Sequence, residues 1–265
     1  MSGPVPTISA DLRATLRRLK LGQVLDTLPE RLVLASAHGL GHGEFLELVL
    51  SDEVSRRDRT SAVLRAKAAH LDPKMTLEAW DPLAQVSYDR AVLDELVSMR
   101  FIETAQNVFV LGPVGVGKTF IATALGHIAC RHRIKVHFER ADKLFRRLKV
   151  TRLDASYDAE VRKLIGADLL IIDDFALQRL DAVETADFYE LVVERHKAAA
   201  TVLTSNRAPD EWLSMLADPL LAQSAVDRLQ SSAWELVIEG ESYRQRERPS
   251  IPPPSSPRAR RERAT

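Results

Sequence analysis

The fold is decided by the stretch Gly112-Pro113-Val114-Gly115-Val116-Gly117-Lys118-Thr119, which matches the pattern G-x-x-x-x-G-K-[ST]. An apolar run that predicts a strand (108–111) precedes it, and residues 118–131 predict a helix. Its glycines let the backbone curl so that successive N–H groups point at phosphate oxygens, and the helix N-terminus adds a partial positive charge. We therefore expect a loop that binds the phosphates of ATP rather than a glycine-rich turn.

The residue types at the end of this loop have distinct expected roles. Lys118 should reach the β- and γ-phosphates, and the Thr119 hydroxyl should ligate Mg²⁺. The predicted nucleotide-binding set is Gly112, Pro113, Val114, Gly115, Val116, Gly117, Lys118, Thr119 and Phe120.

A second, acidic element follows in the stretch 169–174, where four apolar residues precede Asp173 and Asp174. The apolar run predicts a buried strand (169–173), and ligands bind at the carboxyl ends of strands in open α/β sheets. We expect Asp173 to hold Mg²⁺ and Asp174 to polarise the attacking water. The alternative is a strand that ends in a solvated turn.

Two further polar positions have both a functional and a structural interpretation. Asn206 follows a predicted strand (201–204) and could orient the hydrolytic water, or it could simply turn the chain before Pro209. Arg228 lies on a predicted helix and could act as an arginine finger toward a neighbouring subunit, or form a surface ion pair.

Hydrophobic periodicity predicts an α/β fold behind a helical N-terminal region. Residues 11–70 read as helices with a glycine-rich break at 39–43, and Pro73 ends the last of them. Further strands are predicted at 134–138 and 236–238, with helices at 140–149, 158–165, 184–197 and 218–231. Apolar strands that alternate with helices indicate a parallel sheet covered on both faces. We divide the chain into a helical domain (1–75), an ATPase domain (76–248) and a disordered Pro/Arg-rich tail (249–265).

Composition narrows the class of protein. The 265 residues contain 37 Lys and Arg, 37 Asp and Glu, and a single cysteine, Cys130, so an internal disulfide framework is excluded. There is no apolar stretch of the ~18 residues that a membrane span needs, and no secretory signal is visible at the N-terminus. We expect a cytoplasmic protein without a membrane partner.

The ordered set GPVGVGKT, LLIIDDF, TSN, DRL and GESYRQR resembles the AAA+ ATPases of the initiator and helicase-loader clade. More narrowly, residues 10–248 resemble the IstB-like transposition helpers of insertion sequences, which are related to the DnaC helicase loader. The resemblance implies a P-loop AAA+ core of three α/β/α layers with a five-stranded parallel sheet. It also implies ATP and Mg²⁺ as ligands, and an ATP-dependent homo-oligomer on duplex DNA that recruits or stimulates a cognate transposase.

The same resemblance assigns roles to residues and shows two departures. Lys118 and Thr119 would be the Walker A pair, and Asp173 and Asp174 the Walker B acids. Asn206 would be sensor 1, and Arg228 the finger that acts in trans. Asp174 stands where many AAA+ proteins have Glu, so water activation could be slow. The usual C-terminal helical lid is missing, which leaves Arg244 as a candidate sensor 2.

Basic residues suggest where DNA could bind. Residues 131–152 contain nine Lys or Arg and two acids, and Arg146, Arg147 and Lys149 lie near the end of one predicted helix. Arg13 and Arg17 share a face of the first helix. Such groups could follow a phosphate backbone, although charge runs are usually solvated helix surface.

Three other functions fit parts of the sequence. A replicative helicase loader would use the same motifs, with its N-terminal helices bound to a helicase. A P-loop kinase for small molecules would need an Arg-rich lid and an acceptor pocket, and would have no use for Asn206 or a trans Arg228. A switch that binds ATP and hardly hydrolyses it is compatible with Asp174.

Overall fold

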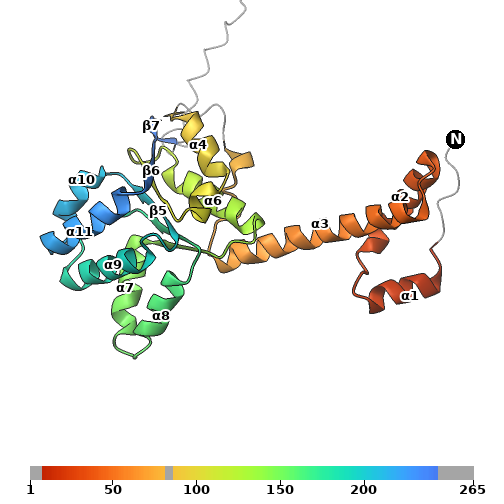
Figure 1. Ribbon diagram of the computed structural model, residues 1–265, viewed down its shortest axis with the longest axis horizontal. Coiled ribbons are helices and arrows are strands. Elements are labelled where there is room, and N and C mark those ends of the chain that lie inside the picture. Colours follow the sequence, from red (N-terminus) through yellow and green to blue (C-terminus); the bar gives the residue numbers. More distant parts are fainter. Residues whose placement is uncertain (1–7, 81–85, 244–265) are drawn as a thin grey trace, which may run out of the picture.

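A five-stranded parallel sheet forms the centre of the protein. The computed structural model describes residues 8–80 and 86–243 (Figure 1). The strand order is β3-β4-β5-β2-β6, and every neighbouring pair is parallel. The strands are β2 (Asn107–Leu111), β3 (Val136–Arg140), β4 (Leu169–Asp173), β5 (Ala200–Ser205) and β6 (Ala233–Val237).

The strands are apolar on both faces because both faces are covered. In β4, Leu169 and Ile171 point into one hydrophobic cluster, whereas Leu170 and Ile172 point into the other. This alternation is the reason that the central strands read as continuous apolar runs.

Helices cover the two faces of the sheet. One face packs against α6 (Lys118–Arg131), α4 (Arg90–Val97), α5 (Arg100–Glu103) and the end of α3 (His42–Ala68). The other packs against α7 (Ala141–Thr151), α8 (Tyr157–Ile165), α9 (Ala182–Arg195), α10 (Pro209–Trp212), a 3₁₀ turn η2 (Leu213–Met215) and α11 (Pro219–Gln230). The result is the expected three-layer α/β/α core (Figure 1).

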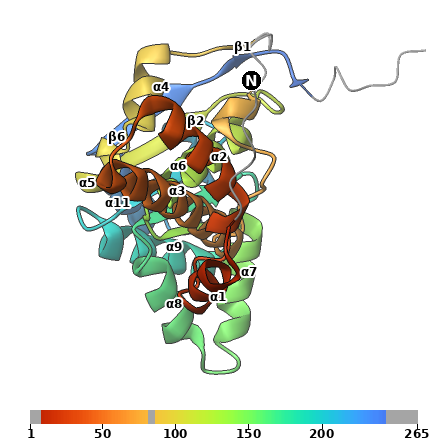
Figure 2. The ribbon, with the colours of Figure 1, turned by 90° about the vertical axis from the view of Figure 1, so that its right-hand side faces the viewer.

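An extended arm carries the N-terminal helices. Figure 1 shows α3 projecting from the core, with α1 (Ala10–Arg18) and α2 (Val24–His38) at its far end, and Figure 2 views the molecule from that end. The chain turns between α2 and α3 at Gly39, whose φ of 64° favours glycine. Val24, Leu28 and Val49 form a small separate core there. The opposite end of α3 joins the main core, because Ala66 and Ala69 are buried in it.

A small second sheet ties the chain before the core to the chain after it. β1 (Val86–Ser87) pairs antiparallel with β7 (Glu239–Gly240), and a 3₁₀ turn, η1 (Leu77–Ala79), precedes β1. Within the described residues, β7 is followed only by 241–243, so no helical lid is seen there. The sensor 2 candidate Arg244 and the tail at 249–265 lie outside the described residues.

The sequence predictions are confirmed for the fold class, and the largest shifts in strand boundaries are at β3 and β6. β4 and α6 have the predicted bounds, whereas β3 begins two residues later than predicted. Ile134 does not join the strand because its N–H still closes the end of α6 on Ala129 O, at 3.0 Å. β6 begins three residues earlier than predicted, since an edge strand is only half buried and its sequence is not continuously apolar. No helix in the described part of the chain is long and apolar enough to cross a membrane.

A buried arginine on α9 joins the end of α8, the loop before β4 and the start of β5. Arg195, only 3% exposed, donates from Nη1 to the carbonyl oxygens of Leu164, Ile165 and Ala167 at 2.7–3.0 Å. It also donates to the carbonyl of Ala200 and the hydroxyl of Thr201. Burial lowers the pKa of Arg195 to about 10, so the side chain keeps its charge at neutral pH.

Arg195→Met is expected to lower the free energy of unfolding by at least about 3 kcal/mol. The substitution keeps the apolar length but leaves several buried carbonyls without donors, at about 1–3 kcal/mol for each unsatisfied group. Urea unfolding followed by circular dichroism measures the change. Arg100→Met is the matched control, because Arg100 is exposed and its one ion pair among the described residues is with Glu95, so its unfolding curve should overlay the wild type. Equal stability of the two variants would contradict this role for Arg195.

Candidate functional site

The phosphate-binding loop joins β2 to α6 and follows a path that demands its glycines. Gly112, Gly115 and Gly117 have φ values of 145°, 88° and 100°, a region that other residues rarely adopt. A Cβ on Gly112 would come within 2.1 Å of the Ile238 carbonyl oxygen. The two glycines of the sequence pattern, Gly112 and Gly117, therefore reflect a geometric requirement, and Gly115 meets a further one.

Segments from both ends of the core pack on this loop. A Cβ on Gly117 would lie 2.6 Å from the ring of Trp80, and one on Gly115 would lie 2.0 Å from Oγ of Ser242. The N–H of Tyr243 donates to Gly115 O at 2.9 Å. The loop is thus enclosed by the segment before β1 and the segment after β7.

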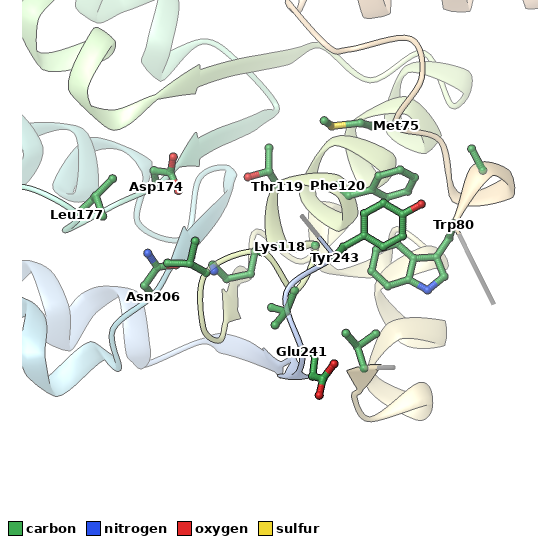
Figure 3. A pocket seen from close by; sticks show the side chains of 16 residues that line it. Met75, Trp80, Lys118, Thr119, Phe120, Asp174, Leu177, Asn206, Glu241 and Tyr243 are labelled. Atoms are coloured by element: carbon green, nitrogen blue, oxygen red, sulfur yellow. The ribbon is translucent and has the colours of Figure 1, made fainter. Parts of the chain in front are cut away.

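A cavity of about 360 Å³ lies above the loop (Figure 3). Its polar end carries Lys118, Thr119, Asp174 and Asn206, and its other end carries aromatic side chains. Its lining is Met75, Ala79, Trp80, Val86, Val114, Gly115, Val116, Gly117, Lys118, Thr119, Phe120, Asp174, Leu177, Asn206, Glu241 and Tyr243. A cavity with an apolar end and a phosphate-binding end suits a nucleotide.

The sequence predicts only one of the aromatic residues at this end of the cavity. The Trp80 ring meets Phe120 edge-on, with centroids 5.2 Å apart, and meets Tyr88 at 6.2 Å. Phe120 follows the loop directly and was predicted, whereas Trp80 and Tyr243 lie about 40 residues before and 125 after it. They reach the cavity because β1 pairs with β7. Strands of two residues have no recognisable sequence pattern, so this pairing could not be predicted.

Asp173 lies at the end of β4, directly beneath the loop, and is 3% exposed. The Thr119 hydroxyl donates to its two carboxylate oxygens at 2.9 and 3.1 Å, and Thr204 Oγ1 donates to Oδ1 at 2.6 Å. Burial raises the pKa of Asp173, and nearby Asp174 adds to that effect, while the bonds from Thr204 and Thr119 oppose it.

This arrangement fits a magnesium ion bound with a nucleotide. Mg²⁺ usually takes one or two protein oxygen ligands together with phosphates and water. The hydroxyl of Thr119 and the buried, undercompensated carboxylate of Asp173 supply such oxygens. Among the residues described there is no group of three or more His, Cys, Asp or Glu that could hold a metal by itself. A metal here would therefore depend on the nucleotide.

Lys118, Asp174 and Asn206 complete the polar end. The Lys118 ammonium donates to Pro113 O at 2.6 Å, across the curl of the loop. Asp174 has φ 55°, an uncommon conformation outside glycine, and its N–H donates to Thr204 Oγ1 at 2.9 Å. The sequence predicts Thr204 only as the end of the strand before Asn206, yet its hydroxyl connects both acids.

Arg228 does not face this cavity. It lies half-buried on α11, where its Nη1 donates to the carbonyl oxygen of Ser224 at 2.8 Å. Its guanidinium carbon lies 5.8 Å from the centre of the Tyr189 ring.

The predicted DNA-contacting residues fall in two separate places. Arg146, Arg147 and Lys149 lie on α7, beside the core, whereas Arg13 and Arg17 lie on α1, at the far end of the arm (Figure 1). Arg147 forms ion pairs with Glu139 and Glu160, and Lys149 with Asp181 and Glu184. Arg146 is exposed and has no ion-pair partner among the described residues.

Asp173→Asn is expected to melt at least as high as the wild type without nucleotide at pH 7. A raised carboxyl pKa means that the folded state loses stability as pH rises above the unfolded pKa, and a neutral side chain removes that loss. Differential scanning fluorimetry measures this. The variant should gain less stability than the wild type from ATP with Mg²⁺, and the two should respond alike to ATP with EDTA. A large drop in melting temperature without ligand would contradict this account of the charge.

Comparison with known proteins gives the family. The family described as IstB-like ATP binding protein matches residues 14–250. An insertion-sequence ATP-binding protein of Mycobacterium tuberculosis is 36% identical over 239 residues, covering 90% of this chain and 95% of that protein. An ATP-binding protein of insertion sequence IS21 from Pseudomonas aeruginosa is 34% identical over 238 residues, covering 90% of each.

Solved structures support the fold. The DnaC helicase loader superposes with a TM-score of 0.54 at 19% identity, covering 63% of this chain and 97% of that one. AMPPCP-bound DnaA from Aquifex aeolicus gives 0.52 at 22%, covering 62% and 50%. At these identities the likeness concerns the fold, a P-loop AAA+ core. With the family match over residues 14–250, the chain belongs to the IstB-like ATP-binding proteins of IS21-type insertion sequences.

Proposed function

We propose that this protein is an ATPase that binds ATP between subunits, assembles on duplex DNA and recruits or stimulates the transposase of its insertion sequence. The observation that carries the proposal is that the nucleotide cavity has too little positive charge of its own for a triphosphate. Among the described residues that line it, Lys118 is the only Lys or Arg, while Asp174 and Glu241 are acids. A triphosphate would need further positive charge during hydrolysis.

Arg228 of a neighbouring copy is the proposed source of that charge. Arg228 does not line the nucleotide cavity of its own subunit. Its side chain is half-buried on α11, in the helix layer that covers the sheet. An arginine contributed in trans stabilises charge on the transferred phosphoryl group and makes assembly depend on nucleotide. ATP would then contact two subunits, and hydrolysis would loosen the assembly.

Within one subunit, the cavity sets the orientation of the nucleotide. The phosphates would lie over the loop, and the base would lie at the aromatic end near Trp80 and Tyr243. Lys118 would exchange its contact with Pro113 O for phosphate oxygens. Mg²⁺, when bound with ATP, would neutralise phosphate charge between Thr119 and Asp173.

Water activation falls to the two remaining polar residues of the cavity. Asp174 would accept a proton from the attacking water, and Asn206 would orient that water. Both side chains lie at the polar end of the cavity, on the side of Lys118 (Figure 3). Because Asp is one methylene shorter than Glu, slow hydrolysis is compatible with this geometry, and the protein could persist in its ATP-bound assembly.

The arm has an exposed apolar face that suits contact with another subunit or with a protein partner. Leu46, Leu50 and Val54 are exposed on α3 at intervals of four residues, so they share one helix face. Contiguous exposed apolar side chains mark interaction surfaces in soluble proteins. The basic side chains Arg146 on the core and Arg13 and Arg17 on the arm would contact DNA phosphates.

The sequence relatives favour transposition over the other candidate functions. They are named as ATP-binding proteins of insertion sequences, and they match about nine-tenths of this chain. The likeness to the helicase loader is at the level of the fold. We therefore place a transposase, rather than a helicase, as the partner.

ATP is expected to drive assembly of this protein on duplex DNA. Analytical ultracentrifugation with ATP, ADP or no nucleotide, at two salt concentrations, should show a large species only with ATP and DNA together. That species should weaken steeply at the higher salt, because phosphate contacts release counterions. Lys118→Ala should not form it. A protein that remains monomeric under every condition contradicts the proposal.

Arg228→Ala should bind ATP as a monomer nearly as well as the wild type and hydrolyse it ~10³-fold more slowly, the size of a typical arginine finger. Mixing this variant with Lys118→Ala gives the sharper test. In mixed assemblies, an intact Lys118 site can face an intact Arg228, so activity should return although neither variant is active alone. Wild-type hydrolysis by Arg228→Ala would exclude the trans role.

A further inference from the structure

The helix that carries Arg228 also carries an acid without an ion-pair partner. Asp227 and Arg228 are the only charged residues of α11. Asp227 is exposed, and it forms no ion pair within the part of the chain that the structure describes. It lies in the last turn of the helix, where the partial negative charge of the helix end makes an acid unfavourable. Asp227 therefore lowers the stability of α11 within one subunit and forms no ion pair there in return.

A second cavity, of about 190 Å³, adjoins the nucleotide cavity. Asp174 and Leu177 line both cavities, and Figure 3 shows them together at the polar end of the first. The loop between β4 and α9 supplies these two residues and, shortly after them, Arg179, which lines the second cavity. The loop therefore places a cation next to the region where a neighbouring Arg228 would approach the phosphates.

The acids of the second cavity do not neutralise Arg179. The three acids that line this cavity are each paired with another cation of the same lining, namely Asp142 and Asp174 with Arg140, and Glu184 with Lys149. Arg179 is exposed and has no ion-pair partner among the described residues. The other unpaired cation, Arg146, lies on α7 and belongs to the surface proposed above for DNA. Arg179 thus needs an anion from outside its own subunit.

The trans placement of Arg228 brings Asp227 toward this cation. Arg228 of a neighbouring copy would approach the phosphates beside Asp174. Neighbouring Cα atoms lie about 3.8 Å apart, and successive side chains of a helix are rotated by about 100° from each other. Since the second cavity begins at Asp174 itself, a helix that presents Arg228 to the nucleotide cavity can present Asp227 to the adjoining one.

Apolar side chains accompany both charges. Leu220 lies seven residues before Asp227 on the same face of α11 and is 79% exposed. Leu177, between the two cavities, is 49% exposed. Exposed apolar side chains beside opposite charges suit a protein interface better than a nucleic-acid backbone. Because the two surfaces are different parts of the same chain, their contact joins copies head to tail.

We propose that Asp227 of one copy forms an ion pair with Arg179 of the next copy, so that a second copy of this chain occupies the second cavity. Arg228 contacts the nucleotide, whereas the pair of Asp227 and Arg179 contacts protein alone. Complementary charges of this kind fix the register of an interface. This inference rests on the proposed trans role of Arg228, and it names the residues on both sides that align the two copies.

The test is the protein concentration that gives half-maximal assembly on duplex DNA with ATP, measured by analytical ultracentrifugation. Asp227→Arg and Arg179→Asp should each raise this concentration by roughly tenfold or more, because like charges then face each other. The double variant Asp227→Arg/Arg179→Asp restores opposite charges and should return to within about threefold of the wild type. ATP hydrolysis should follow the same order, since Arg228 acts only in the assembly.

Matched controls separate the ion pair from net charge and from folding. Glu235→Arg and Arg162→Asp make the same changes of charge at exposed residues that have no ion-pair partner among those described, and both should assemble like the wild type. Combining Asp227→Arg with Arg162→Asp should not restore assembly. Asp227→Arg should melt no lower than the wild type, because a cation is favourable in the last turn of a helix. Melting curves of all variants establish that they are folded.

The outcomes distinguish this inference from the proposed function. If the wild type does not assemble on duplex DNA with ATP, the proposed function fails and this inference with it. If the wild type assembles but the charge-swapped double variant is as weak as its weaker parent, only the ion pair is overturned. Fluorescence anisotropy with ADP measures DNA binding by monomers, where Arg179→Asp should match Arg162→Asp. Much weaker binding by Arg179→Asp would make a DNA phosphate the partner of Arg179 and overturn the pairing.

Discussion

The close packing around the phosphate-binding loop is the constraint on which the rest of the structure depends. The loop must turn at positive φ at three glycines, and each of those positions is approached by a different part of the chain. The approaching groups are Trp80 from the segment before β1, the Ile238 carbonyl after β6, and Ser242 after β7. The β1–β7 pairing brings the first and last of these together. The phosphate-binding loop is therefore also the point where the two ends of the core meet.

A second consequence concerns charge. The site keeps a carboxylate, Asp173, almost fully buried beneath the loop, with hydroxyl groups of Thr119 and Thr204 as its partners rather than a cation. Two hydroxyl donors compensate the buried charge only in part, and the pKa of the carboxyl is raised accordingly. Such an arrangement is unfavourable for an unliganded protein and favourable for one that binds a metal with its substrate. The residues that bear this energetic cost are the ones that would hold such a cation.

Local sequence predicted the parts of the protein that local geometry determines. The loop, β4 with its two acids, and the alternation of strands and helices could be identified because their residue patterns are continuous. The aromatic end of the cavity could not, since Trp80 and Tyr243 meet the loop only through tertiary pairing. The helix α4 and the strands β1 and β7 were also missed, because short elements give too few residues for a periodic pattern. The predicted boundary at residue 75 remains a prediction, and α3 is continuous across most of the arm into the core.

A run of basic residues in the sequence is a weaker guide to ligand binding than the basic side chains that remain unpaired in the fold. The basic segment 131–152 has a local excess of cations, yet most of them meet acids that lie far away in the sequence. The ion pairs are Arg131 with Glu78, Arg133 with Asp58, Arg140 with Asp142 and Asp174, Arg147 with Glu139 and Glu160, Lys149 with Asp181 and Glu184, and Arg152 with Asp187. These pairs bind α7 and its neighbours to the rest of the core and leave little charge for a ligand. Arg146 has no ion-pair partner among the described residues. Arg179 lies outside the basic segment in the sequence, but the fold places it at the same cavity as Arg146. Arg146 and Arg179, which have no ion-pair partner among the described residues, line the same cavity as Asp174.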